Sequence, residues 1–255
     1  MWLPAASLFA VPVADTRAPL SSVTLRWDDR FAIDATLAAD FPVLRVTRGD
    51  LSVDAGIEAM VILGFQPNEN LRFDLETVDG TFGLPVGLRW GLWTGRFEVA
   101  HTSAHFADGV TDDPEPPASS EGYSREWARL LAARQFGPAR LYAGAKALLH
   151  DQRGLPPWSV QAGGEVAGPW KIAPFGAVDV QAAAENGWDP EVAAQVGVRA
   201  QVGGGRRLRV AATGRYGPDD TGKLQGQNEA WLGITFGFDS TGALDTPAGV
   251  DDAPR

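Results

Sequence analysis

The chain of 255 residues contains no cysteine, which excludes disulfide bonds and thiolate metal sites. Basic residues are few, with 22 Lys and Arg against 32 Asp and Glu, for a formal net charge of −10. Because phosphate contacts need clustered Lys and Arg, a nucleic-acid partner is not expected. The sequence has three histidines, no glycine-rich phosphate loop and no Gly-x-Ser-x-Gly elbow, so it offers few catalytic options and predicts no cofactor.

Long apolar runs are also missing. The longest, residues 59–65, is interrupted by a glycine and falls well short of the roughly 18 residues that a membrane helix needs. The N-terminus is apolar, but no basic region precedes it and it contains Pro4 and Pro12. It is therefore a poor match to a signal peptide.

What the sequence does have is apolar residues at every second position over long segments. In residues 191–202, for example, Val196 and Val198 alternate with Gln195 and Arg199. A period of two is typical of strands with one apolar and one polar face, and it is expected in strands that face lipid on one side. The same alternation recurs in residues 51–65, 158–166, 208–216 and 230–238.

Connections of two kinds separate these segments and alternate along the chain. Short ones lie at residues 91–95, 137–139, 167–169 and 203–205, and longer polar ones include residues 107–123 and 218–229. Short turns at one end and long loops at the other are the arrangement of outer-membrane barrels, with the short turns periplasmic.

The fold class predicted is all-β, a single antiparallel transmembrane β-barrel in the bacterial outer membrane, with about 12 strands (10–12) of about 9–13 residues each. Ten strands fit between Leu51 and Phe238, and residues 21–28 and 31–46 supply one more pair. The division expected is an N-terminal extended segment (1–20), the barrel (21–238) and a disordered C-terminal tail (239–255).

Two details of register follow from the alternation. The even-numbered apolar residues from Trp158 to Phe238 should face outward, because a slip by one residue would place Arg199, Arg209 and Arg215 in lipid. Around residues 203–205, paired residue numbers should sum to an even number, which requires a bulge or an odd number of loop residues. The inward faces then carry charges of both signs, which predicts a narrow or closed channel, or a purely structural network of ion pairs.

Three short stretches resemble an uncharacterised family of bacterial outer-membrane proteins, which is described only as a domain of unknown function. Residues 14–19 (Ala-Asp-Thr-Arg-Ala-Pro) resemble its opening segment, residues 101–108 (His-Thr-Ser-Ala-His-Phe-Ala-Asp) its His-x-Ser-Ser-His-x-x-Asp signature, and residues 123–126 the strand start that follows. The second Ser of the signature is Ala104 here. Residues 236–238 (Phe-Gly-Phe) resemble the aromatic-ended signal of barrel assembly, although 17 residues follow. The resemblance implies export and a barrel fold, but no activity.

The one constellation with catalytic potential lies in residues 101–105. On a strand, His101 and His105 are about 13 Å apart, too far to bind one metal ion, so no metal site is expected. His101 and Ser103 share a face about 7 Å apart, which lets their side chains form a hydrogen bond if the rotamers lean together, as a base and a nucleophile must. The pair resembles the His-x-Ser of outer-membrane phospholipase A and of lipid A deacylases, which have Asn where Ala104 stands, and Glu126 is the best candidate to orient His101.

The function favoured by the sequence is non-enzymatic: a narrow channel, or the membrane anchor or scaffold of a cell-envelope complex. The expected partners are outer-membrane lipid and, for an anchor, other envelope proteins. The alternative is a hydrolase of outer-leaflet lipid that uses His101, Ser103 and Glu126. If the protein is not a hydrolase, these three polar residues only contact headgroups and water at the rim of the barrel. A third possible function is that of a soluble ligand-binding barrel.

Overall fold

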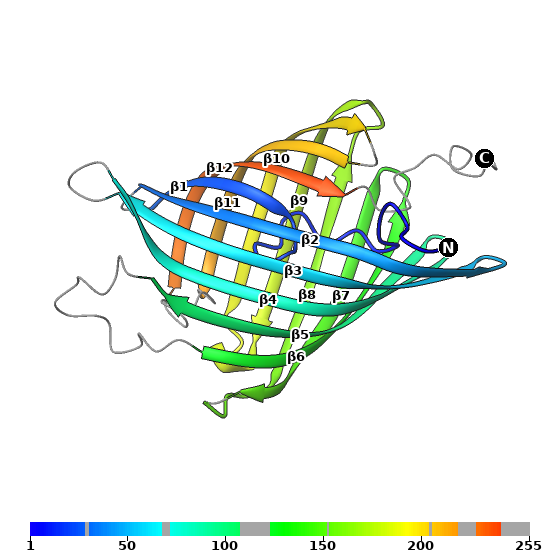
Figure 1. Ribbon diagram of the computed structural model, residues 1–255. Coiled ribbons are helices and arrows are strands. Elements are labelled where there is room, and N and C mark those ends of the chain that lie inside the picture. Colours follow the sequence, from blue (N-terminus) through cyan, green and yellow to red (C-terminus); the bar gives the residue numbers. More distant parts are fainter. Residues whose placement is uncertain are drawn as a thin grey trace.

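The computed structural model describes residues 1–28, 31–67, 72–107, 123–151, 153–203, 206–218 and 228–240. Across these residues, strands form a closed antiparallel barrel in which each strand pairs with its neighbours in sequence and the last closes against the first (Figure 1). The predicted fold class is confirmed. The strands are β1 (Ser21–Trp27), β2 (Phe31–Arg48), β3 (Leu51–Pro67), β4 (Phe73–Trp90), β5 (Trp93–Phe106), β6 (Tyr123–Phe136), β7 (Ala139–Asp151), β8 (Trp158–Ala167), β9 (Ile172–Ala183), β10 (Pro190–Gly203), β11 (Arg206–Pro218) and β12 (Asn228–Ser240), with a 3₁₀ turn, η1 (Ala184–Asn186), between β9 and β10.

The two faces of the wall follow the sequence alternation. Val196 and Val210 are 65% and 42% exposed on the outside, while Arg199, Arg209 and Arg215 are buried inside. The other even-numbered apolar residues between Trp158 and Phe238 that the sequence singled out are exposed or partly exposed and none is buried, so the predicted register is confirmed. The described part of the chain contains no helix of the length and apolarity that a membrane crossing requires.

An arginine on the outer face tests this register directly. Val196 lies in the middle of β10, so we expect Val196→Arg to lower the free energy of unfolding in lipid by about 2–4 kcal/mol. Val202, at the end of the same strand and also exposed, is the matched control, for which Arg should cost about 0–1 kcal/mol. Urea unfolding in vesicles measures both, and equal costs at the two depths would contradict a lipid-facing wall.

The second register prediction is also confirmed. Val192 pairs with Tyr216 and Gln201 with Arg207, so paired numbers across β10 and β11 sum to an even number, and a bulge follows between Gln201 and Gly203. Residues 204 and 205 lie outside the described residues. So do most of the two longest predicted loops (108–122 and 219–227) and, from residue 241 on, the predicted tail.

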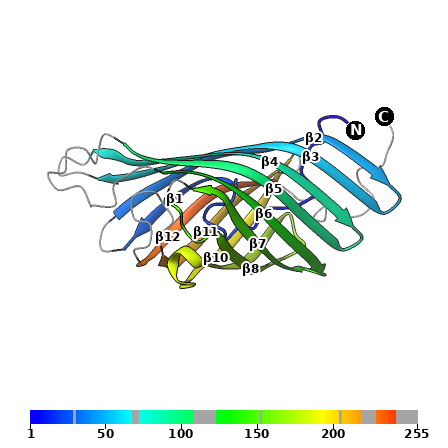
Figure 2. The same ribbon diagram turned by 90° about the horizontal axis from the view of Figure 1, so that it is seen from below.

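Several strands are longer than the 9–13 residues expected. β2 and β4 have 18 residues and β3 has 17. The apolar alternation marks only the part of a strand that faces lipid, whereas the ladder of hydrogen bonds continues through polar pairs such as Thr47 with Ser52. Strands β2, β3 and β4 are therefore much longer than β1, which has seven residues (Figure 2).

The N-terminal segment begins at the rim of the barrel, and most of it lies inside (Figure 1). Met1 and Leu3 bond to the backbone of β2 near its short turn, through Arg45 N–H to Met1 O (2.9 Å) and Leu3 N–H to Val43 O (2.9 Å). Residues 4–20, which we call the plug, then run through the lumen. Two groups of apolar plug residues pack on inward side chains: Phe9 on Leu131, Ala133 and Tyr142, and Val11, Val13, Ala14, Ala18 and Leu20 on Phe175, Ala177 and Ala211.

Candidate functional site

A group of polar side chains on the outside of the wall forms the first candidate site. The outer-wall cluster consists of His101 and Ser103 on β5, Ser124 and Glu126 on β6, and His150 on β7. Antiparallel pairing places His101 directly opposite Glu126, Ser103 opposite Ser124, and Glu126 opposite His150. Residues 102 and 125 alternate inward and are buried, so the strand period alone brings the five polar side chains to one outer face.

Hydrogen bonds connect four members of this cluster in a chain. Glu126 Oε1 lies 2.8 Å from His101 Nδ1, and Glu126 Oε2 lies 2.8 Å from His150 Nδ1. An ionised carboxylate only accepts, so each Nδ1–H donates. In neutral His101 the other nitrogen, Nε2, is then an acceptor, and the hydroxyl of Ser124 lies 3.3 Å from it. Ser124, His101 and Glu126 therefore stand in the order hydroxyl, base and orienting acid.

The predicted residues are brought together in part. His101 and Glu126 meet as expected, but Ser103 and His101, both described, form no hydrogen bond with each other, and the hydroxyl beside His101 is that of Ser124. Ala104 faces the lumen and is fully buried, so its side chain offers nothing to the outer wall. His105 is exposed one strand repeat beyond Ser103, and Asp108 of the proposed signature lies outside the described residues.

The surroundings of the cluster are apolar on the side towards the barrel's middle. Phe82 pairs directly with His101 from β4 and is 54% exposed, and Val99 and Leu130 continue the outer faces of β5 and β6. His101 and Glu126 are themselves about half exposed. The cluster therefore lies where the apolar band ends and the long-loop end begins, which in outer-membrane barrels is the depth of lipid headgroups and ester bonds.

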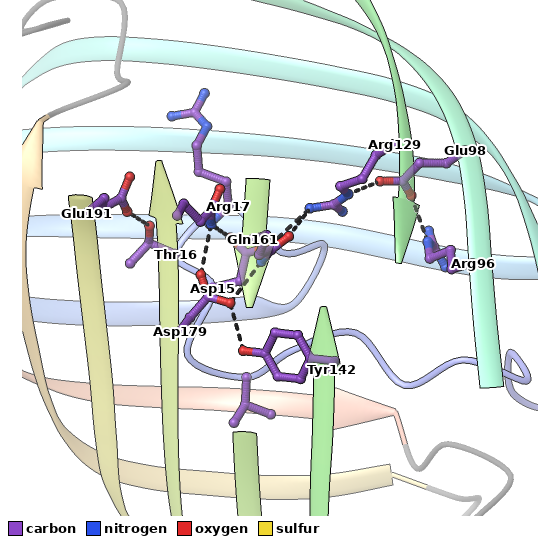
Figure 3. Close-up of polar contacts among 12 residues, drawn as sticks. Asp15, Thr16, Arg17, Arg96, Glu98, Arg129, Tyr142, Gln161, Asp179 and Glu191 are labelled. Carbon is purple, nitrogen blue, oxygen red and sulfur yellow. Dashed lines mark hydrogen bonds and ion pairs between the residues drawn. The ribbon is translucent and has the colours of Figure 1, made fainter. Parts of the chain in front are cut away.

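The second candidate site is the contact between the plug and the lumen, which centres on Asp15 (Figure 3). Its carboxylate accepts hydrogen bonds from Arg129 (3.2 Å), Gln161 (3.0 Å) and Gln181 (3.2 Å). These partners come from β6, β8 and β9, so one buried side chain of the plug ties three strands together. Arg17, two residues further on, forms an ion pair with Asp79 of β4 at 3.1 Å.

The network continues through the lumen beyond the plug (Figure 3). Arg129 Nε donates to Glu98 at 2.6 Å, and Glu98 also accepts from Arg96 at 2.6 Å. Arg96 in turn pairs with Asp40 at 2.8 Å and with Glu58. Many of the inward charges that the sequence predicted are thus paired with one another in the lumen, next to the plug.

Sequence reasoning missed the plug and Ser124. The plug could have been suspected, because Asp15 and Arg17 are isolated charges in an otherwise apolar stretch, and charges in such a setting need partners. Ser124 could have been found from the register, since pairing His101 with Glu126 forces Ser103 opposite Ser124. Among the described residues no group of three His, Asp or Glu side chains is arranged to hold a metal ion.

Comparison with solved structures identifies the barrel as one of the outer-membrane type. Outer membrane phospholipase A from Escherichia coli superposes with a TM-score of 0.53 at 12% identity, covering 87% of this chain and 89% of that one. A Salmonella typhi outer membrane phospholipase, crystallised as a dimer with bound calcium, gives 0.52 at 13% identity, covering 91% and 92%. The β domain of the Bordetella autotransporter BrkA gives 0.50 at 11% identity, covering 87% and 96%. At these identities the likeness establishes the fold alone.

Comparison of the sequence gives two further findings. No curated protein matches it. One family model, described as "Protein of unknown function (DUF1207)", matches residues 1–239.

Proposed function

We propose that this chain, which belongs to the DUF1207 family, is an outer-membrane hydrolase that cleaves acyl esters of outer-leaflet lipid on its outer wall. The observation that carries the proposal is the hydrogen-bonded chain from Ser124 through His101 to Glu126, on a wall that is otherwise apolar at that depth. The proposed orientation is that of outer-membrane barrels in general, with the short turns in the periplasm and the long-loop end outside.

The chemistry follows from the order of the groups. His101 Nε2 takes the proton of the serine hydroxyl as the oxygen attacks the ester carbonyl, and Glu126 stabilises the imidazolium that forms. The proton then passes to the leaving alcohol, and an acyl-serine remains. Water, deprotonated by the same nitrogen, releases the fatty acid and restores the hydroxyl. Ser124, His101 and Glu126, the side chains that these steps need, are linked by hydrogen bonds in that order. The donors for the oxyanion are the exception, because the side chain of Ala104 does not supply one.

The lumen gives less support to the channel that the sequence favoured. A channel needs a continuous aqueous path, but Asp15 and the apolar plug residues that pack on the inward side chains lie in the lumen and are at most 6% exposed. A barrel with a segment of its own chain in the lumen is compatible with an anchor or with an enzyme that works from its outer surface. The outer-wall cluster favours the enzyme, because an anchor does not need a hydroxyl, an imidazole and a carboxylate in sequence.

Two serine substitutions test the proposal and identify the nucleophile. Geometry favours Ser124, and the sequence resemblance favours Ser103, which would require the ring of His101 to turn. We expect Ser124→Ala to lower the release of fatty acid from phospholipid or lipid A vesicles by at least about 100-fold, since removal of a nucleophile leaves only binding and electrostatic effects. Ser103→Ala should lower it far less.

The other outcomes are equally informative. A large loss in Ser103→Ala alone would keep the hydrolase and reassign the nucleophile. No release by the wild-type protein, or equal release by the wild type and the double variant, would refute the proposal and leave the anchor or channel.

A further inference from the structure

The short-turn end of the lumen contains a pocket between the plug and the strand ends, which is partly open to solvent. Leu8, Ala10, Val11 and Val13 of the plug form one side of it. Its charged lining residues come from four strands: Arg140 (β7), Glu165 (β8), Arg199 (β10) and Asp239 (β12). None of these belongs to the outer-wall cluster.

Arg199 is the unusual member of this lining. It is only 7% exposed, and its Nε is buried without a hydrogen-bond partner. Its guanidinium lies over the ring of Phe175, 4.7 Å from the centroid, which fixes its position. Among the described residues no carboxylate lies within ion-pair distance of it, and its cross-strand partner on β11 is another arginine, Arg209.

The two carboxylates of the pocket each lie beside another group, although the oxygens of Asp239 are buried without a hydrogen bond to a described residue. Asp239 lies 3.3 Å from Arg209, and Glu165 accepts the backbone N–H of Val13 at 2.7 Å. Glu165 also lies 3.5 Å from Arg140, but neither terminal nitrogen of Arg140 makes a hydrogen bond to a described residue. Three arginines therefore share two carboxylates, and guanidinium donors are left over.

A buried cation without a partner is destabilising, and like charges directly opposite each other on a sheet add to the cost. A pocket that holds such donors rigidly, with empty space beside them, is suited to a planar or tetrahedral oxyanion, because a guanidinium donates two parallel hydrogen bonds to carboxylate or phosphate. We propose that this pocket binds a small oxyanion, the carboxylate or phosphate group of a periplasmic solute, through Arg199 and Arg140. The inference does not depend on the hydrolase.

Calorimetric titration of the full chain in a non-ionic detergent tests the site. The probes are inorganic phosphate and succinate, with sodium chloride at equal ionic strength in every cell. We expect saturable binding of at least one probe, weakened at least tenfold in Arg199→Gln. Arg199→Lys keeps the charge but loses the paired donors, so it should bind with intermediate affinity. Phosphate and succinate then distinguish the two sources of the oxyanion.

Arg134→Gln is the matched control, because Arg134 lies at the same end of the barrel but contacts Trp93 and Phe136 instead of the pocket. It should bind as the wild type does. The proposal is overturned if the wild type binds neither probe, or if Arg199→Gln and Arg199→Lys both bind with wild-type affinity. If Arg199→Gln does not fold, the affinity of Arg199→Lys tests the proposal. Weaker binding than in the wild type supports it, and wild-type affinity overturns it.

Discussion

Replacement of His101 by alanine is expected to lower fatty-acid release by about 10²–10⁴-fold, the range in which a positioned general base contributes to catalysis. The effect should lie in kcat, because the imidazole acts on the proton that moves in the transition state and not on the lipid chains. Single-turnover release of fatty acid from labelled phospholipid or lipid A in vesicles measures it. The carboxylate of Glu126 loses one of its two histidine partners but keeps His150, and it is partly exposed, so the fold itself should be unaffected.

His105→Ala is the control for this substitution. His105 lies on the same strand and the same outer face, four residues further on, and is equally exposed. Its removal should leave release within about twofold of the wild type, as surface changes away from the reacting groups usually do. Equal losses in the two variants would indicate a general disturbance of the rim and would remove the case for His101 as a base.

The second large effect concerns the plug. We expect Asp15→Ala to lower the free energy of unfolding by about 3–5 kcal/mol, the cost of removing one partner from a buried ion pair. The substitution leaves Arg129, Gln161 and Gln181 without their shared acceptor, and the first two of these side chains are buried. Urea unfolding of the barrel in vesicles, followed by tryptophan fluorescence, measures the change.

Thr16→Ala, one residue along the plug, is the matched control. Its hydroxyl makes one hydrogen bond to Glu191, at 3.3 Å, so the loss should be about 0.5–1.5 kcal/mol. If Asp15→Ala costs no more than Thr16→Ala, the plug is not held by the Asp15 network, and its place in the lumen depends on the apolar contacts alone.

Much of the wall could be predicted from the sequence, because the pattern that determines it is local. Alternation in residues 191–202 predicted the outward face of β10 and even the parity of its pairing with β11. Nothing local marks where a ladder stops, so the lengths of β2, β3 and β4 were underestimated. The plug was missed for the same reason: Asp15 finds Arg129 and Gln161 more than a hundred residues away, and only the closed barrel brings them together.

In the candidate site, too, some features could be predicted from the local sequence and others depend on the folded structure. His101 and Glu126 were predicted to lie close together because neighbouring antiparallel strands place the end of one beside the start of the next. The structure places His101 Nδ1 2.8 Å from Glu126 Oε1. The choice between Ser103 and Ser124 depends on which way the imidazole points, which strand spacing does not determine. The family is confirmed by the match over residues 1–239, whereas the proposed signature around His101 remains a hypothesis.

The seam between β1 and β12 has a consequence for how the chain folds. The threonine hydroxyls of residues 24 and 235 meet across it at 2.9 Å, although 211 residues separate them in sequence. Contacts at such separation form late, because most of the chain's entropy must be lost before they provide any stabilisation. β1 is also the shortest strand of the described barrel, and it follows directly after the plug. We therefore expect the plug to enter an open, curled sheet before β1 closes the ring, so that the plug and β1 are among the last parts of the barrel to reach their final place.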